Sequence, residues 1–120
     1  MELNEYQRRA METCMPSCRN ISYMLLNLVG EVGELASKIA KDIRKDEVEI
    51  YRNGLIPNME EDRWWARNDE YMKEAGDILW QLSGFCSIMG WTLEEVAKGN
   101  LDKLASRKER GVIEGNGDNR

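Results

Sequence analysis

The sequence predicts an all-α protein, a bundle of four to five helices, and three observations support this. Apolar residues recur with the 3.6-residue period of an α-helix, and alternating β-branched runs, which are typical of strands, are nearly absent. Only two prolines, Pro16 and Pro57, interrupt the pattern. No low-complexity segment or linker divides the 120 residues, so we expect one helical domain over residues 1–120.

The first two helices are bounded by clear signals. A helix over about 5–13 ends before the Met15–Pro16 step, because a residue that precedes proline is disfavoured in helical geometry. A long helix follows over about 20–44. The next segment, about 45–68, is rich in charge and contains NGLIPN, so we do not assign regular structure to it.

The second half of the chain predicts two further helices. One covers about 69–89, and the other opens at Thr92. Thr92 and Glu95 have the spacing of a capping box, in which each side chain bonds the backbone N–H of the other residue. This helix ends before Gly111, and about 109–120 forms a loop-like tail with three glycines.

Charge, hydropathy and cysteine content argue against nucleic-acid binding, secretion and membrane insertion. The formal net charge is -5, which argues against binding to a nucleic-acid backbone. From the polar start of the chain we expect no signal peptide, and the most apolar run, 78–91, is too short and too polar to span a membrane. Three cysteines, an odd number, suggest reduced thiols, so we expect a cytoplasmic protein.

The chain contains no histidine, which narrows the possible chemistry. Ser/His and Cys/His nucleophilic pairs are therefore excluded, and a structural zinc site is improbable. Any catalysis must depend on carboxylates, lysines, arginines and a metal ion.

Two pairs of acidic residues have matching surroundings. Glu31-Val-Gly-Glu34-Leu and Glu74-Ala-Gly-Asp77-Ile share the order acid, small or aliphatic residue, glycine, acid, aliphatic residue. Residues three apart lie on one helix face, and both faces border apolar positions. A helix-interior glycine costs about 1 kcal/mol, so Gly33 and Gly76 suggest a close approach of the two helices.

Close approach would bring four carboxylates together. Converging carboxylates repel one another unless a cation neutralises them, and Mg²⁺ prefers such oxygen ligands. Either pair alone is more simply explained by surface charge, with Glu34 and Lys38 as an ordinary ion pair. The two pairs together favour a metal site formed by Glu31, Glu34, Glu74 and Asp77.

A basic face lies on the last predicted helix. Asn100, Lys103 and Arg107 recur at positions that share one face, and lysine and arginine are common phosphate ligands. The alternative is that these cations only complement the helix dipole. The glycine-rich tail could wrap over bound phosphates, or it could be disordered.

The ordered set of these residues resembles a known family. The two acidic motifs, followed by Asn100, Lys103 and Arg107, are similar to the MazG-type all-α nucleoside triphosphate pyrophosphohydrolases, the superfamily of MazG, dimeric dUTPase and dCTP pyrophosphatase. The likeness extends to the opening Leu3-Asn4-Glu5-Tyr6-Gln7 and to Arg110-Gly111.

The resemblance implies an activity, a cofactor and an assembly. It implies hydrolysis of a (deoxy)nucleoside triphosphate to the monophosphate and pyrophosphate, with Mg²⁺ or alternatively Mn²⁺, and a homodimer or homotetramer. Carried over, Glu31, Glu34, Glu74 and Asp77 would hold the metal. For the mechanism, we expect Glu34 or Glu31 to orient or deprotonate the attacking water. The substrate phosphates would be contacted by Asn100, Lys103 and Arg107, with Lys38 as a further candidate.

One segment departs from the compact members of the family. The spacer 42–73 is longer than usual and contains Trp64-Trp65, which could stack on a base or, more simply, cover the core or a subunit interface. Base selectivity therefore stays open. Two alternatives to the main hypothesis remain: a phosphoribosyl-ATP pyrophosphohydrolase, and a non-enzymatic helical interaction module with Trp80, Phe85 and Trp91 as its dimer seam.

Overall fold

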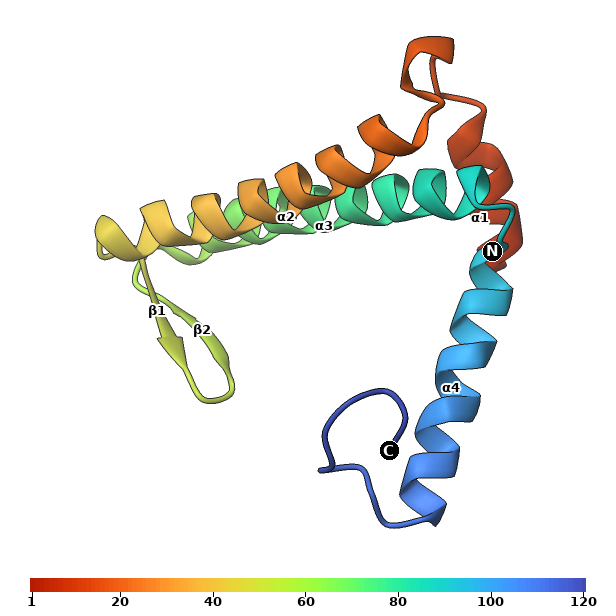
Figure 1. Cartoon of the computed structure of the whole chain (residues 1–120). Coiled ribbons are helices and arrows are strands. Elements are labelled where there is room, and N and C mark those ends of the chain that lie inside the picture. The colour runs from red at the N-terminus through yellow and green to blue at the C-terminus, as the bar shows by residue number, and fades with distance from the viewer.

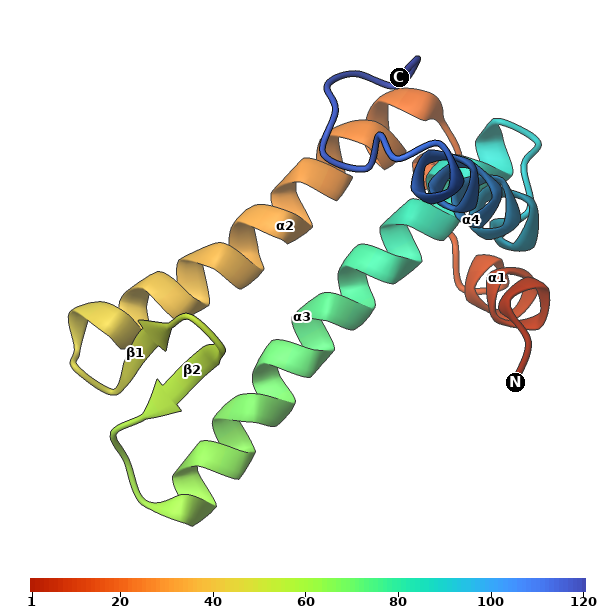
Figure 2. The ribbon, with the colours of Figure 1, turned by 90° about the horizontal axis from the view of Figure 1, so that it is seen from below.

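The computed structural model describes all residues, 1–120, and is mostly helical, which confirms the predicted fold class. Two long antiparallel helices, α2 and α3, lie side by side, α1 packs at one end of α3, and α4 projects away from the pair (Figures 1 and 2). In chain order the elements are α1 (Leu3–Met11), the 3-10 turn η1 (Pro16–Cys18), α2 (Ile21–Arg44), β1 (Val48–Tyr51), β2 (Gly54–Pro57), α3 (Glu61–Ile88) and α4 (Leu93–Glu109).

The starts of α2 and α4 follow the capping rules. The side chain of Asn20 accepts a hydrogen bond from the backbone N–H of Tyr23 at 2.8 Å. Thr92 Oγ1 accepts from the Glu95 N–H at 3.1 Å, and Glu95 Oε2 accepts from the Thr92 N–H at 2.9 Å. The predicted capping box is therefore present, and each cap satisfies backbone groups that a helix end leaves unpaired.

The segment between the two long helices differs from the prediction. α3 begins at Glu61, eight residues before the expected start, and so includes Trp64 and Trp65. Its first turn carries Glu61 and Asp62, whose negative charges favour the positive end of a helix dipole. No glycine or proline interrupts the helix before Gly76, so nothing in this stretch opposes helix formation.

A two-stranded antiparallel hairpin, β1–β2, occupies the remainder of that segment and was not predicted. Val48 pairs with Pro57, and Tyr51 pairs with Gly54, across the loop Arg52-Asn53. Asn53-Gly54 follows Val48-Glu49-Ile50-Tyr51, a short run in which apolar and charged residues alternate, and this is a hairpin signal that the surrounding charges obscured. Gly54 adopts a φ of 137°, a value that residues with a side chain rarely adopt.

The close contact between α2 and α3 is at Gly84, which corrects the expectation for Gly33 and Gly76. A Cβ atom at Gly84 would lie 2.2 Å from Met24 Sδ, so only glycine leaves room for this buried methionine. At Gly33 and Gly76, a Cβ atom would meet no atom of a neighbouring element within 4 Å. The two glycines therefore do not mediate packing between α2 and α3 of one chain.

A buried ionic cluster ties the far ends of α2 and α3 together. Asp42, which is 5% exposed, accepts hydrogen bonds from Arg67 and from the hydroxyl of Tyr71. Burial alone would raise the pKa of Asp42, but these hydrogen bonds outweigh it and lower the pKa below its usual value. Burial and the bond to Asp42 also raise the pKa of Tyr71 to about 12.

α1 holds the turn between α3 and α4. Gln7 Nε2 donates to Ser87 Oγ at 3.0 Å and to the Trp91 carbonyl at 2.9 Å, and Gln7 Oε1 accepts from the Leu93 N–H at 2.8 Å. Trp80 Nε1 donates to the Ala10 carbonyl at 3.1 Å. The opening segment that resembled the family therefore has a structural role in this chain.

The molecule is more open than a folded chain of its length normally is. The radius of gyration is 17.8 Å, whereas about 14 Å is typical for this number of residues. No helix combines the length and apolar character that crossing a membrane requires. Large apolar side chains stay exposed on both long helices, among them Leu25, Leu26, Val29, Val32, Trp65 and Met72.

We predict that Asp42→Asn lowers the free energy of unfolding by about 1–3 kcal/mol at pH 7, because Arg67 loses its buried charged partner. The loss should shrink below about pH 4, since the stability due to a carboxylate with a lowered pKa disappears as it protonates. Urea unfolding of wild type and variant at pH 7 and pH 3 measures this. Asp69→Asn, at an exposed carboxylate of α3, is the control, and equal losses at both pH values would contradict the ionic role.

Candidate metal centre

Three of the four predicted carboxylates converge between α2 and α3. Glu31, Glu74 and Asp77 each place one oxygen within 4.8 Å of those of the other two. Glu74 is buried, Glu31 is half-buried, and Asp77 is exposed, so the cluster opens to solvent on one side. This spacing is compatible with oxygens that share one divalent cation.

Two oxygens of the cluster lack any partner within the chain. Glu31 Oε2 and Glu74 Oε2 are buried and accept no hydrogen bond. Burial, and then the charges of Glu34 and Asp77, raise the pKa of Glu31. A buried carboxylate oxygen without a donor is costly, and a cation bound between the carboxylates would offset that cost. The donor set therefore fits a hard divalent metal ion.

Lys38 contacts the cluster in a way that the sequence did not predict. Its Nζ lies 2.7 Å from Glu74 Oε1 on α3, whereas the expected partner was Glu34 on its own helix. The hydrogen bond to Glu74 raises the pKa of Lys38. The lysine side chain is 42% exposed, so it neutralises part of the cluster and still reaches solvent.

Two amide side chains, Asn27 on α2 and Gln81 on α3, form hydrogen bonds beside the cluster. Asn27 Nδ2 donates to Gln81 Oε1 at 2.9 Å and to Glu31 Oε1 at 3.3 Å. Gln81 is 1% exposed, and its Nε2 donates to the Met24 carbonyl at 3.4 Å. Asn27 lies four residues before Glu31, and Gln81 lies four residues after Asp77, so each amide shares a helix face with an acidic residue. This spacing in the sequence could have predicted their position beside the cluster.

Glu34 lies outside the group of three. It is exposed, and its carboxylate is not among the oxygens that converge. It is nevertheless close enough to raise the pKa of Glu31 through charge repulsion. Glu34 as a metal ligand therefore stays a prediction, and its position leaves it available for another role beside the cluster.

The basic residues of α4 are not brought to this cluster within one chain. α4 packs on α1, and its remaining length projects away from α2 and α3 (Figure 1). Asn100 is exposed, whereas Arg107 is 4% exposed and Lys103 lies beside it. Both cations contact Asp118 of the tail, at 3.3 Å from Lys103 Nζ and 3.0 Å from Arg107 Nη2. Asp118 was missed, because a glycine-rich tail has no periodicity that places a residue in space.

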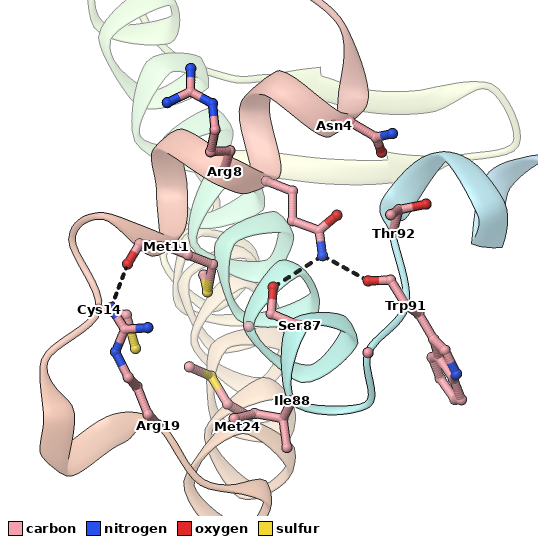
Figure 3. Close-up of a pocket in the computed structure, with 13 residues that line it drawn as sticks. Asn4, Arg8, Met11, Cys14, Arg19, Met24, Ser87, Ile88, Trp91 and Thr92 are labelled. Atoms are coloured by element: carbon pink, nitrogen blue, oxygen red, sulfur yellow. Dashed lines mark hydrogen bonds between the residues drawn. The ribbon is translucent and has the colours of Figure 1, made fainter.

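The largest cavity is separate from the cluster. It has a volume of about 530 Å³ and lies between α1, the 14–19 segment, the end of α3 and Trp91 (Figure 3). Gln7 donates hydrogen bonds to Ser87 and to the Trp91 carbonyl. Arg19 donates to the Met11 carbonyl, and dashed lines in Figure 3 mark these bonds. These polar groups are satisfied within the chain, so the cavity offers mainly apolar surface and not a set of unpaired donors and acceptors.

The tryptophans do not converge on the cluster. Trp64 packs edge-to-face on Tyr71 with ring centroids 6.3 Å apart, and Trp65 is 56% exposed. Phe85 packs in the same way on Trp91 at 5.9 Å. Trp80, Phe85 and Trp91 therefore each have a contact within the chain, while Trp91 keeps 44% of its surface exposed.

A mostly helical chain with a triad of carboxylates between two long helices belongs to the class of helical proteins that could hold a divalent metal ion, and sequence comparison gives the family. The MazG nucleotide pyrophosphohydrolase domain matches residues 19–112, so the chain belongs to this family. It is also similar to the gene 37 protein of Mycobacterium phage L5, with 35% identity over 127 aligned positions that cover both chains completely. No solved structure matches the chain.

We predict that Asp77→Asn weakens Mg²⁺ binding about tenfold or more, since it removes one anionic oxygen from the cluster. Isothermal titration of the nucleotide-free protein with MgCl₂ measures the effect. Asp69→Asn, at an exposed carboxylate on the same helix, should bind like the wild type. Equal affinities for all three proteins would exclude the cluster as the metal site.

Proposed function

We propose that the protein hydrolyses a (deoxy)nucleoside triphosphate to the monophosphate and pyrophosphate in a Mg²⁺-dependent reaction, as a housekeeping enzyme of the nucleotide pool. The observation that supports this is the triad Glu31, Glu74 and Asp77, with two buried oxygens that lack partners. Membership of the MazG pyrophosphohydrolase family gives the reaction class.

The acidic residues have distinct roles in this proposal. Glu31, Glu74 and Asp77 hold Mg²⁺, with Mn²⁺ as an alternative ion. The bound ion supplies positive charge to the phosphate oxygens and lowers the pKa of water. Glu34, whose carboxylate lies beside the triad and not within it, orients the attacking water and accepts its proton. Glu31, which lies within the triad, is the alternative base.

Lys38 and the α4 residues provide positive charge for the substrate. Lys38 is already beside Glu74, and its exposed ammonium can turn to a phosphate group that approaches the cluster. Lys103 and Arg107 bind the triphosphate as a second cationic group, and Asn100 adds an amide on the same face of α4. Within one chain, α4, which carries Asn100, Lys103 and Arg107, does not pack on the α2–α3 pair that carries the triad.

A second copy of the chain resolves this separation. Trp65, Met72 and Leu79 are spaced seven residues apart on α3 and are 56%, 64% and 39% exposed. Leu25 and Val32, also seven apart on α2, are 47% and 50% exposed. A heptad spacing of exposed apolar residues is typical of helices that pack in a bundle. We therefore propose a homodimer, or a homotetramer of two such dimers, in which α4 of one copy reaches the triad of its partner.

The reaction is tested by product analysis. With Mg²⁺ and a panel of the common NTPs and dNTPs together with phosphoribosyl-ATP, anion-exchange chromatography should show a nucleoside monophosphate and pyrophosphate. Asp77→Asn and Glu34→Gln should each lose activity by about a hundredfold or more, as removal of a metal ligand or a general base does. Glu49→Gln on the hairpin is the control.

The outcomes separate the candidate functions. Near-wild-type activity in both variants would contradict the proposed mechanism. Turnover of phosphoribosyl-ATP alone would identify the alternative substrate. Absence of both turnover and Mg²⁺ binding would favour the interaction module.

The assembly is tested at the α3 seam. Met72→Glu should shift the protein to a monomer at micromolar concentration, because it places a charge in an apolar interface. Sedimentation velocity measures the shift, and activity should fall with it. Ala66→Glu, an exposed position of α3 off the seam, should remain dimeric. A wild-type protein that sediments as a stable monomer would contradict the proposed assembly.

A further inference from the structure

The tail folds back on α4 and places one carboxylate between two cations. Asp118 Oδ1 lies 3.0 Å from Arg107 Nη2 and 3.3 Å from Lys103 Nζ. Arg107 Nη2 also donates to the Asp118 carbonyl at 3.1 Å. One aspartate therefore contacts both of the cations assigned to the substrate phosphates.

The tail is held in this position by arginines. Arg120 donates to the carbonyls of Val112 at 3.0 Å, of Ile113 at 3.2 Å and of Gly117, and Arg110 donates to the Arg120 carbonyl at 2.7 Å. Gly117 has a φ of 78°, which only glycine adopts readily. These bonds close the loop seen beside α4 in Figure 1, so Asp118 is presented by a bonded loop.

The cations need such a partner. Lys103 and Arg107 are four residues apart on one helix face, where like charges repel each other. Arg107 is 4% exposed, and a buried guanidinium without a counter-charge is strongly unfavourable. Asp118 supplies that charge, and its pKa is lowered by the hydrogen bonds from Arg107 and Lys103.

Lys103 and Arg107 have further N–H donors that do not bond Asp118. Arg107 Nε is buried and has no partner, and the Lys103 side chain is 41% exposed with further donors free. An unpaired buried donor beside an ion pair is a group for which the chain itself offers no acceptor. The free donors of Lys103 reach solvent, so a phosphate oxygen of a bound polyphosphate can contact them beside the Arg107–Asp118 pair.

We propose that Asp118 is a positioning residue, which holds Lys103 and Arg107 together in the arrangement that binds the polyphosphate of the substrate. The inference depends on the proposed function, since it assigns the substrate phosphates to these two cations. Asp118 itself does not touch the substrate. Its effect is preorganisation: the cations are fixed before binding, so less conformational freedom is lost when the phosphates arrive.

Two measurements on Asp118→Asn and Asp118→Glu test this. The first is calorimetric binding of inorganic tripolyphosphate without metal, and the second is the KM and kcat of nucleotide hydrolysis. Asp118→Asn should weaken tripolyphosphate binding and raise KM about tenfold, with kcat changed less than about twofold, because a charge-assisted bond is lost from the binding arrangement. Asp118→Glu keeps the charge and should recover most of the affinity.

A matched control lies on α4 itself. Asp102 pairs with Lys98 at 2.7 Å, and both side chains are exposed, so Asp102→Asn removes a comparable ion pair away from Arg107. It should leave tripolyphosphate binding and KM unchanged. An effect of Asp102→Asn as large as that of Asp118→Asn would assign the change to general charge and would overturn the positioning role.

The remaining outcomes are also decisive. Tighter tripolyphosphate binding by Asp118→Asn would show that the aspartate competes with phosphate, and unchanged binding would show that it has no role. Both results overturn the proposal. Tripolyphosphate binding that depends on Asp118, without nucleotide hydrolysis, would support the positioning role and refute the proposed function. Hydrolysis with a normal KM in Asp118→Asn would support the proposed function and refute the positioning role.

Discussion

The contact of Met24 with Gly84 sets the register of α2 against α3, and the carboxylate triad depends on that register. Only glycine leaves room for the methionine, whose sulfur would lie 2.2 Å from a Cβ atom at this position. Glu31 lies seven residues after Met24, and Asp77 lies seven residues before Gly84. In antiparallel helices both steps move about 10 Å in the same direction. The carboxylates therefore meet two turns away from the sulfur contact.

The triad is stabilised from both ends of the helix pair. On one side, Gln81 and Asn27 link α3 to α2, and Asn27 donates a hydrogen bond to Glu31. On the other side, Lys38 pairs with Glu74, and the Asp42 cluster with Arg67 and Tyr71 fixes the helix ends. These contacts offset part of the repulsion among three carboxylates and leave two buried oxygens without a partner. The residual cost is what binding of a cation would recover.

Local signals in the sequence predicted much of the fold. The 3.6-residue pattern located α2 and α4, and the Thr92 cap located the start of α4, because these features act within a few residues of chain. The hairpin was missed although Asn53-Gly54 is a turn signal, since the flanking charges resembled a loop. The closest helix contact was assigned to Gly33 and Gly76 and not to Gly84, because propensity shows where a glycine is costly and not which residue it faces.

The candidate site was predictable only in part for a similar reason. Periodicity places Glu31 and Glu34 on one face, but only the crossing of α2 and α3 determines that Glu31 joins Glu74 and Asp77 while Glu34 stays exposed.

The open shape of the chain bears on both its assembly and the proposed site. The radius of gyration is 17.8 Å, and apolar residues at heptad spacing are exposed on both long helices. Exposure of this apolar surface to water is unfavourable. The same openness separates the triad from Lys103 and Arg107. If a second copy covers the apolar seam, one association step both buries that surface and brings a cationic arm to a carboxylate cluster. Assembly and substrate binding would then be coupled, and the tail that fixes the arm would act on the partner's active site.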